Sequence, residues 1–220
     1  MHDRLSWLRG LKLRGYVGPK YDGLRGKLRL FWQGWYGHEE IVSYAEPEWW
    51  EPPKEINRDV SLLVTESFDE AVPYLAELRK AYFRDFAADW EMFFGWGQTV
   101  SLALLEGRLA GFGWIQDGNK GAVAPYLPLL PGERRLLRGG VLPNLRGKRV
   151  HTTRYALLLE HLFSRGARRV YIDVFSDNVY SWKGQQKAGF REAGRVRVRR
   201  TLGGKTYVRW MPVRRPESHG

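Results

Sequence analysis

The chain contains no cysteine. Disulfides, thiolate metal sites and cysteine nucleophiles are therefore excluded. The five histidines show no spacing typical of metal ligands; they are His2, His38, His151, His161 and His219. We therefore expect a protein without a bound metal.

Long apolar runs are also lacking. No segment approaches the roughly 18 apolar residues that a membrane-spanning helix needs. Near the N-terminus, Arg9, Gly10 and Lys12 interrupt the continuous apolar run that a signal peptide requires. The sequence therefore predicts a soluble, cytoplasmic protein.

Large apolar side chains are abundant. The chain is 43% hydrophobic and holds 10 Trp, 11 Tyr and 10 Phe among 220 residues, so it can bury a core. This length favours one domain with an extension over two equal domains. We predict a basic N-terminal extension with short strands over residues 1–58, a main domain over 59–215 and a tail over 216–220.

Charge is distributed unevenly along the chain. Residues 134–215 contain 21 Lys and Arg against 4 Asp and Glu, whereas residues 38–133 contain 7 against 17. A basic C-terminal half suits a polyanionic ligand, and an acidic middle suits a cationic one. The net charge of +12 and the Arg-rich run from Arg195 to Arg200 also leave open a nucleic-acid-binding protein.

Residues 1–37 mix basic side chains with Leu and Trp. One interpretation is peripheral contact with an anionic membrane surface. The other, which we favour, is an arm that packs on its own domain or on a second copy of the chain in a homodimer.

Hydrophobic periodicity predicts alternating strands and helices in the main domain. Ser67 to Phe83 is predicted to form a helix capped at Asp69, which places Pro73 at the fourth helical position, where its missing N–H costs no bond. Residues 100–105 and 109–115 are predicted to form a hairpin around Glu106-Gly107-Arg108. Strands are also predicted at 28–32, 40–44, 60–65, 134–142, 169–175, 193–200 and 206–211, with helices at 148–163 and 179–187.

A strand, a glycine-containing loop and a helix follow one another from Val141 to Phe163. The first N–H groups of a helix lack partners and its dipole is positive there, so this order predicts an anion site.

Two motifs in this region resemble those of the GNAT superfamily of N-acetyltransferases. Gly140 to Leu159 resembles the acetyl-CoA loop V-x-P-x-x-R-G-x-G-x-G/A before an aliphatic helix. Asp177 to Ser181 and Gln186 to Phe190 resemble a second signature, N-x-x-S/A followed by K-x-G-F. The resemblance implies an α/β (α+β) fold, with a mixed, mostly antiparallel twisted sheet of six to seven strands flanked by about four helices.

The resemblance also implies which residues bind acetyl-CoA or another acyl-CoA. The splayed strand at Val141 and Leu142 would pair with the pantetheine arm, and the Leu142 amide would face the thioester carbonyl. The pyrophosphate would be held by Arg146, Gly147, Lys148, Arg149, Val150 and His151, and the CoA arm by Asn178 and Ser181. Arg149 and His151 stand where the family has glycines.

The implied catalytic groups depart from the family in one position. Many members have a tyrosine acid where this chain has Gln185, and an amide cannot donate that proton. Tyr180 is a candidate substitute, although it also fits a partly buried helix aromatic. Asp173 is the candidate general base, because attack on a thioester requires a neutral amine; a solvated or salt-bridged strand carboxylate is the alternative.

Aromatic residues and acidic charge coincide between residues 82 and 114, which suits a cationic amine. The predicted acceptor-binding residues are Tyr82, Asp85, Trp90, Glu91 and Trp114. The expected function is transfer of acetyl from acetyl-CoA to the primary amine of a small molecule or peptide, by direct attack in a ternary complex. The alternatives are a nucleic-acid-binding protein and a catalytically inactive CoA-binding module.

Overall fold

The structure of the chain is a computed structural model that describes residues 37–82, 85–118, 126–200 and 206–212. The strand expected at residues 28–32 lies outside this range, and so do the proposed membrane or dimer contacts of the first 36 residues. Among the described residues, eight strands form one sheet in the order β2-β3-β4-β5-β6-β1-β7-β8.

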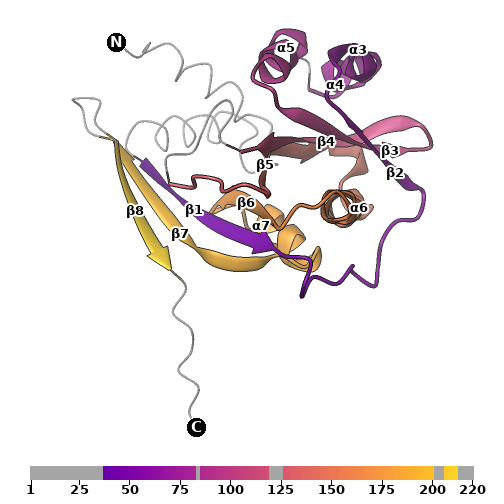
Figure 1. Cartoon of the computed structure of the whole chain (residues 1–220). Helices are drawn as coiled ribbons and strands as arrows, with labels where there is room; N and C mark the ends of the chain where they lie inside the picture. The colour runs from indigo at the N-terminus through magenta and orange to yellow at the C-terminus, as the bar shows by residue number, and fades with distance from the viewer. Residues whose placement is uncertain (1–36, 83–84, 119–125, 201–205, 213–220) are drawn as a thin grey trace.

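Most of the sheet is antiparallel, and helices lie on both of its faces (Figure 1). The strands are β1 (Gly37–Ala45), β2 (Val60–Thr65), β3 (Thr99–Leu105), β4 (Arg108–Asp117), β5 (Glu133–Val141), β6 (Arg169–Phe175), β7 (Arg191–Arg200) and β8 (Thr206–Pro212). The predicted mixed sheet is confirmed, with eight described strands where six to seven were expected.

Strand β1 corrects the predicted domain boundary. It pairs antiparallel with both β6 and β7, so it is an internal strand of the sheet. A boundary near residue 58 would separate this strand from its partners. Local sequence patterns could not show this, because the partners of β1 lie more than 120 residues away along the chain.

The hairpin β3–β4 forms as predicted. Its turn holds Glu106 at φ 53° and Gly107 at φ 76°, the left-handed pair that a tight hairpin turn needs. The register runs from Leu105 opposite Arg108 to Thr99 opposite Ile115.

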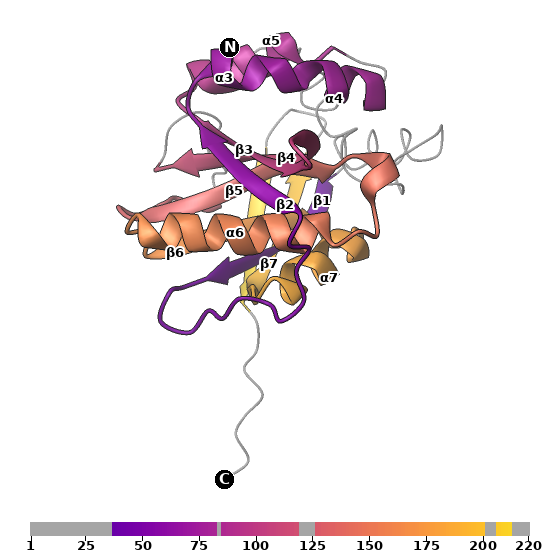
Figure 2. The ribbon, with the colours of Figure 1, turned by 90° about the vertical axis from the view of Figure 1, so that its right-hand side faces the viewer.

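One face of the sheet is covered by a helical layer made of α3 (Phe68–Ala71), a 3-10 turn (Val72–Tyr74), α4 (Leu75–Tyr82) and α5 (Ala87–Gly95). These elements lie together at the top of Figure 2. Their core residues, such as Leu78 and Trp90, pack with Phe112 and Trp114 of β4.

The helix cap predicted at Asp69 is wrong. Ser67 is the cap, and its hydroxyl accepts a hydrogen bond from the Glu70 amide at 3.4 Å. Pro73, six residues after that cap, lies in the 3-10 turn that separates α3 from α4. The predicted single helix is therefore interrupted at Pro73, which has no N–H to donate to a continuous helix. This break allows Ser67 to cap α3.

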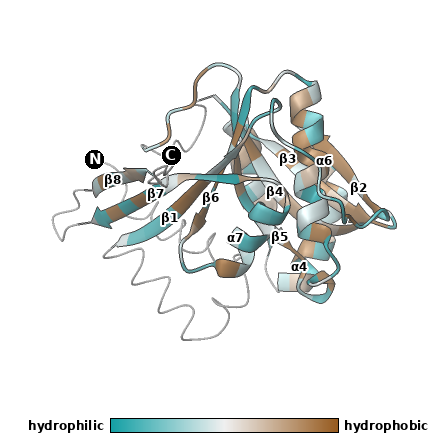
Figure 3. Cartoon of the chain, turned by 90° about the horizontal axis from the view of Figure 1, so that it is seen from below, coloured by the Kyte–Doolittle hydropathy of each residue, from teal (hydrophilic) through white to brown (hydrophobic). Residues whose placement is uncertain are grey.

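The other face carries α6 (Val150–Ser164), which crosses the sheet in Figure 2, and α7 (Val179–Lys187). Leu158, Leu159 and Leu162 of α6 pack with Val170 and Ile172 of β6, as the periodicity predicted. Gly166, at φ 83°, ends α6. Figure 3 shows α7 as mostly hydrophilic, in keeping with its position at the edge of this layer. No described helix is both long and apolar enough to cross a bilayer.

Candidate functional site

A groove of about 1070 Å³ opens between the end of β5, the start of α6, helix α7 and the segment around Lys54. We call it the α6 groove. It brings together most of the residues predicted to bind the cofactor, although they come from three separate elements. These lining residues are Val141, Arg146, Gly147, Arg149, Val150, His151, Asn178 and Ser181. Tyr180, which was predicted as a catalytic residue, lines the groove as well.

Two strands diverge beside the groove. The parallel pairing of β5 with β6 runs from Glu133–Arg169 to Leu136–Ile172 and is not continued beyond, although both strands extend further. Beyond Leu136, the edge of β5 that faces β6 is therefore left without ladder bonds from that strand, so its backbone groups are available to an extended ligand.

The alternation of hydrogen bonds decides which β5 amide faces this opening. The Leu142 amide donates to the Ala110 carbonyl of β4 at 2.9 Å. The prediction that this amide faces the thioester is therefore wrong for this structure. In an antiparallel pair the neighbouring residue points its amide and carbonyl the other way, so Val141, opposite Gly111, presents its backbone to the open edge.

The loop before α6 keeps the backbone shape of a glycine loop. Gly147 has φ 84° and Arg149, the N-cap of α6, has φ 59°. Arg149 therefore adopts the left-handed conformation that suits the glycine of the resembling motif. Its side chain makes no capping bond, and the first backbone bond of the helix joins the Thr153 amide to the Arg149 carbonyl at 3.0 Å. The first-turn amides before Thr153 precede this bond, and such amides at a helix start suit an anion.

His151 replaces the last glycine or alanine of that motif, and its ring packs against α7. A Cβ on Gly184 would lie 2.8 Å from Cδ2 of His151, and the His151 ring also meets Tyr155 edge-on at 4.5 Å. Burial, and then the nearby Arg154 charge, lower the pKa of His151 to about 3, so the ring is neutral. The ring therefore fits beside the loop because the facing helix position is a glycine.

Basic side chains surround the groove. Its lining includes Lys54, Arg146, Arg149, Lys183 and Lys187. Glu55 also lines the groove, and its carboxylate lies 2.5 Å from Nη2 of Arg149. This excess of positive charge suits a ligand with several phosphates. No local sequence pattern points to Lys54, Lys183 and Lys187, because only the fold brings them to the motif.

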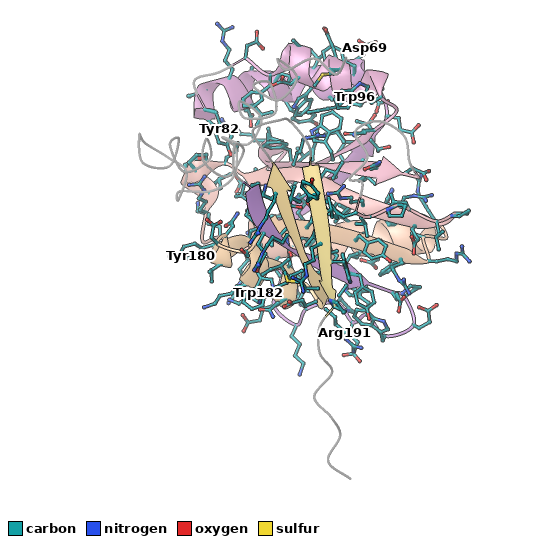
Figure 4. All side chains as sticks on the ribbon, turned by 90° about the vertical axis from the view of Figure 1, so that its left-hand side faces the viewer. Asp69, Tyr82, Trp96, Tyr180, Trp182 and Arg191 are labelled. Atoms are coloured by element: carbon teal, nitrogen blue, oxygen red, sulfur yellow. The ribbon has the colours of Figure 1, made fainter. Side chains whose placement is uncertain are left out.

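The predicted residues of α7 differ in what their side chains do. Asn178 caps the helix, accepting from the Ser181 amide at 3.3 Å, and is only 5% exposed. Tyr180 is 81% exposed and projects from α7, as Figure 4 shows. Gln185 is buried, and its Oε1 finds no partner among the described residues.

Asp173 lies on the opposite face of the sheet from α6, in a buried polar network. Nε of Arg135 donates to Oδ1 of Asp173 at 2.6 Å, and Nη2 of Arg135 donates to the Tyr126 hydroxyl at 3.1 Å. That hydroxyl donates in turn to Glu40, whose Oε1 lies 2.8 Å from Nε2 of His38.

The two buried carboxylates of this network titrate in opposite directions. Burial raises the pKa of Asp173, although the Arg135 charge opposes the rise. Burial also disfavours the charged form of Glu40, but the His38 hydrogen bond and charge, with the Tyr126 hydroxyl, lower its pKa to about 2. Of the two carboxylates, Asp173 is therefore the one whose pKa is raised, so that its protonated form is favoured. Asp173 was predicted from the sequence, whereas its network partners Arg135, Glu40 and Tyr126 were not.

The predicted acceptor residues do not form one site. The Tyr82 hydroxyl donates to the Val141 carbonyl at 3.3 Å, which brings α4 to the edge of β5. Trp90 and Trp114 are each 1% exposed, and their rings meet edge-on in the core with 5.5 Å between the ring centres. Both side chains are therefore core residues and are not exposed to an acceptor. Asp85 and Glu91 are exposed, and Oδ1 of Asp85 accepts from the Ala87 amide at 3.0 Å.

Comparison with known structures gives the same fold. A GCN5-related N-acetyltransferase from Sphaerobacter thermophilus superposes with a TM-score of 0.53 at 15% identity, over 87% of this chain and 58% of that one. A GCN5-related glucosamine N-acetyltransferase region of a fungal multi-domain GH3 β-N-acetylglucosaminidase gives 0.55 at 11% identity, over 80% and 23%.

A third structure, AAC(6')-Ib with paromomycin and acetyl-CoA, gives a TM-score of 0.50 at 18% identity, over 70% of this chain and 93% of that one. At these identities the likeness shows the fold alone. This chain covers about three fifths of several of the solved structures that it matches. No curated protein sequence matches it.

A family model described as the acetyltransferase (GNAT) family matches residues 59–190, which is more than half of the chain. The match includes β5, the loop before α6, the start of α6 and α7, which supply most of the groove lining, while the segment around Lys54 lies outside it. The chain therefore belongs to the acetyltransferase (GNAT) family.

Proposed function

We propose that the chain transfers the acetyl group of acetyl-CoA to a primary amine of a small molecule or peptide, by direct attack in a ternary complex. The observation that carries this proposal is the continuity of the α6 groove, which joins the anion site at the start of α6 to the open edge of β5 at Val141. The pyrophosphate and the extended pantetheine arm of one acetyl-CoA molecule can then bind along the same groove.

The groove suits CoA in both shape and charge. The amides after Arg149, with the Arg146 and Arg149 side chains, would hold the pyrophosphate. Because His151 is turned against Gly184, its ring does not have to occupy the phosphate side of the loop. Val141 would pair with the pantetheine arm through its backbone, and the groove-lining Ser181 would contact it from α7.

The transfer chemistry then divides between the two faces of the sheet. The amine nitrogen attacks the thioester carbon, the carbon–sulfur bond breaks, and its electron pair leaves on sulfur. Asp173, or a water bound to it, takes the amine proton from the face opposite α6. The Val141 amide is the best-placed donor to the developing oxyanion, which moves that role by one residue from Leu142.

Tyr82 supports an acceptor site on the Asp173 face. Its hydroxyl reaches the Val141 carbonyl, so α4 borders the place where the thioester would end. Two of the structural neighbours are described as acting on, or binding, amino-sugar compounds: one is a glucosamine N-acetyltransferase region, and the other carries paromomycin. A small amine with several hydroxyl groups is therefore the first class to test.

A thiol-release screen tests the proposal. Purified protein is incubated with acetyl-CoA and longer acyl-CoAs against amino sugars, amino acids, peptides and polyamines, and free thiol is measured. Release that depends on both the acyl-CoA and an amine is expected, and Arg146→Ala should raise the KM for acetyl-CoA. No release with any amine, together with CoA binding, would point to the inactive CoA-binding module.

The nucleic-acid alternative is weakened by ion pairs on β7. Arg195 and Arg197 both contact the Glu39 carboxylate, at 3.4 and 3.0 Å, and Arg195 also contacts Glu192 at 3.1 Å. Part of the basic stripe is therefore neutralised by the protein itself. Salt-sensitive binding to random-sequence DNA at low micromolar concentration would revive this alternative.

A further inference from the structure

Arg154 is a buried arginine for which the described residues supply no carboxylate partner. It lies on α6 and is only 2% exposed. Nη1 donates to the Ser101 hydroxyl at 3.0 Å, and the guanidinium lies 4.6 Å from the centre of the Tyr155 ring. Its Nε finds no partner among the described residues. The guanidinium also hydrogen-bonds the Tyr155 side chain. Two neutral hydroxyls and an aromatic ring do not supply the negative charge of a carboxylate.

Two glycines make room for this guanidinium. A Cβ on Gly113 of β4 would lie 2.3 Å from Nη1, and a Cβ on Gly139 of β5 would lie 2.7 Å from Nη2. The charge is thus pressed against the backbone of both strands, where any side chain would displace it. Gly139 also lines the α6 groove. The guanidinium therefore lies next to Gly139, a residue that also lines the groove.

An unpaired buried charge is costly, because it has lost its hydration without gaining a counter-ion. Burial lowers the pKa of Arg154, yet a guanidinium stays protonated at neutral pH. Charges interact over longer distances in a low-dielectric interior than in water. A negative charge that forms in the groove beside Gly139 would therefore be stabilised by Arg154 without direct contact.

We propose that Arg154 is a positioning residue that holds a fixed positive charge next to Gly139. This charge would stabilise the thiolate of CoA as it leaves. This inference rests on the proposed function. In the transfer step the nitrogen–carbon bond forms, the carbon–sulfur bond breaks with its electron pair on sulfur, and Asp173 takes the amine proton. Gln185 cannot protonate the sulfur, and the alternative acid Tyr180 is 81% exposed on α7. In this proposal CoA therefore leaves as an anion, and Arg154 supplies the charge that makes this departure easier.

The thiol pKa of bound CoA tests this proposal without turnover. The chain has no cysteine, so alkylation by iodoacetamide in the binary complex reports on the CoA thiol alone. The pH dependence of the alkylation rate gives the thiol pKa, with CoA occupancy checked by calorimetry. The bound thiol should have a pKa at least about one unit below the value of about 8.5 for a free thiol.

Two Met variants provide the comparison. Arg154→Met should return the thiol pKa to near the free value and lower kcat roughly tenfold to hundredfold, with little change in the KM for acetyl-CoA. Arg165→Met, at the far end of α6, removes the same formal charge and should leave the thiol pKa unchanged. Ser101→Ala should keep the pKa low, because the charge remains.

The outcomes separate this proposal from the function on which it rests. A wild-type complex that binds CoA but leaves the thiol pKa at the free value overturns the role of Arg154, and so does an Arg154→Met variant with the wild-type thiol pKa. If Arg154→Met does not fold, the wild-type measurement decides. Failure to bind CoA at all would instead overturn the proposed function, and this inference with it.

Discussion

The His151 ring occupies the space that a side chain at position 184 would need, with 2.8 Å between Cδ2 of His151 and a Cβ placed on Gly184. The two residues lie on α6 and α7, the two helices that border the groove. His151 stands where the family motif has glycine or alanine. The space for its larger side chain comes from a glycine, Gly184, on the facing helix. This pairing allows the phosphate loop to keep its shape without its last glycine.

Replacing Gly184 should therefore disturb the groove. Gly184→Ala forces the His151 ring against Tyr155 or moves α7, and we expect it to lower the unfolding free energy by about 1 kcal/mol after the gain in helix propensity is counted. The Kd for CoA should rise. Calorimetry and thermal unfolding measure both effects.

Two controls accompany this prediction. Gly95→Ala, on α5, meets no atom within 4 Å and should be neutral or slightly stabilising. The double variant His151→Ala, Gly184→Ala removes the clash and should recover most of the lost affinity. A double variant as weak as Gly184→Ala alone would mean that the ring is not the cause.

Arg149→Gly should change stability and affinity in opposite directions. Glycine relieves the left-handed strain at φ 59°, worth about 1 kcal/mol, while loss of the exposed pair with Glu55 costs little. CoA affinity should nevertheless fall, because a phosphate partner is lost. Arg149→Ala serves as the control, since it loses the charge and keeps the strain. A gain in CoA affinity in the glycine variant would contradict a role for the Arg149 side chain in phosphate binding.

Asp173→Asn should lower kcat while leaving the Kd for CoA near the wild-type value. Because burial raises the pKa of Asp173 and the base acts when deprotonated, activity should fall as pH drops through a pKa above the ordinary value of about 3.9. The pH–rate profile of the wild-type enzyme tests this before any substitution is made.

Asp173→Asn leaves Arg135 buried beside a neutral side chain. The unfolding free energy of this variant must therefore be measured in parallel. Asp117→Asn is the matched control: Asp117 pairs with Arg134 at 2.8 Å but is 58% exposed, and its loss should be nearly silent. A wild-type rate that is independent of pH from 5 to 8 and survives Asp173→Asn would remove Asp173 from the mechanism.

His151 should make the fold sensitive to acid. Its pKa is lowered to about 3 in the folded state from 6.5, so the unfolded chain binds more protons between these values. Stability contributed by the neutral ring is fully present above pH 6.5 and is lost as pH falls toward 3. Chemical denaturation across this range should show a shallower pH dependence for His151→Gln than for the wild type. Parallel curves for the two proteins would mean that the ring is protonated in the folded state.

The sequence alone determined the elements whose signals are local. Glu106-Gly107 predicts the hairpin turn, the apolar stripe of α6 predicts its packing face, and the order of strand, loop and helix from Val141 predicts the anion site. These features depend on residues a few positions apart, whose backbone preferences and spacing act before the chain is folded. For the same reason the resemblance to the GNAT motifs identified eight of the residues that line the groove: Val141, Arg146, Gly147, Arg149, Val150, His151, Asn178 and Ser181.

Tertiary structure decided what depends on partners far away in the chain. The insertion of β1 between β6 and β7, the Arg135–Asp173 pair and the burial of Trp90 and Trp114 have no local signal. The choice between the Leu142 and Val141 amides was likewise made by the register of β5 against β4, because a shift of one residue reverses which edge a backbone group faces. The loop before α6 can therefore be predicted from neighbouring residues in the sequence. The placement of Arg135, Asp173 and Glu40 around the proposed reaction depends on the three-dimensional packing.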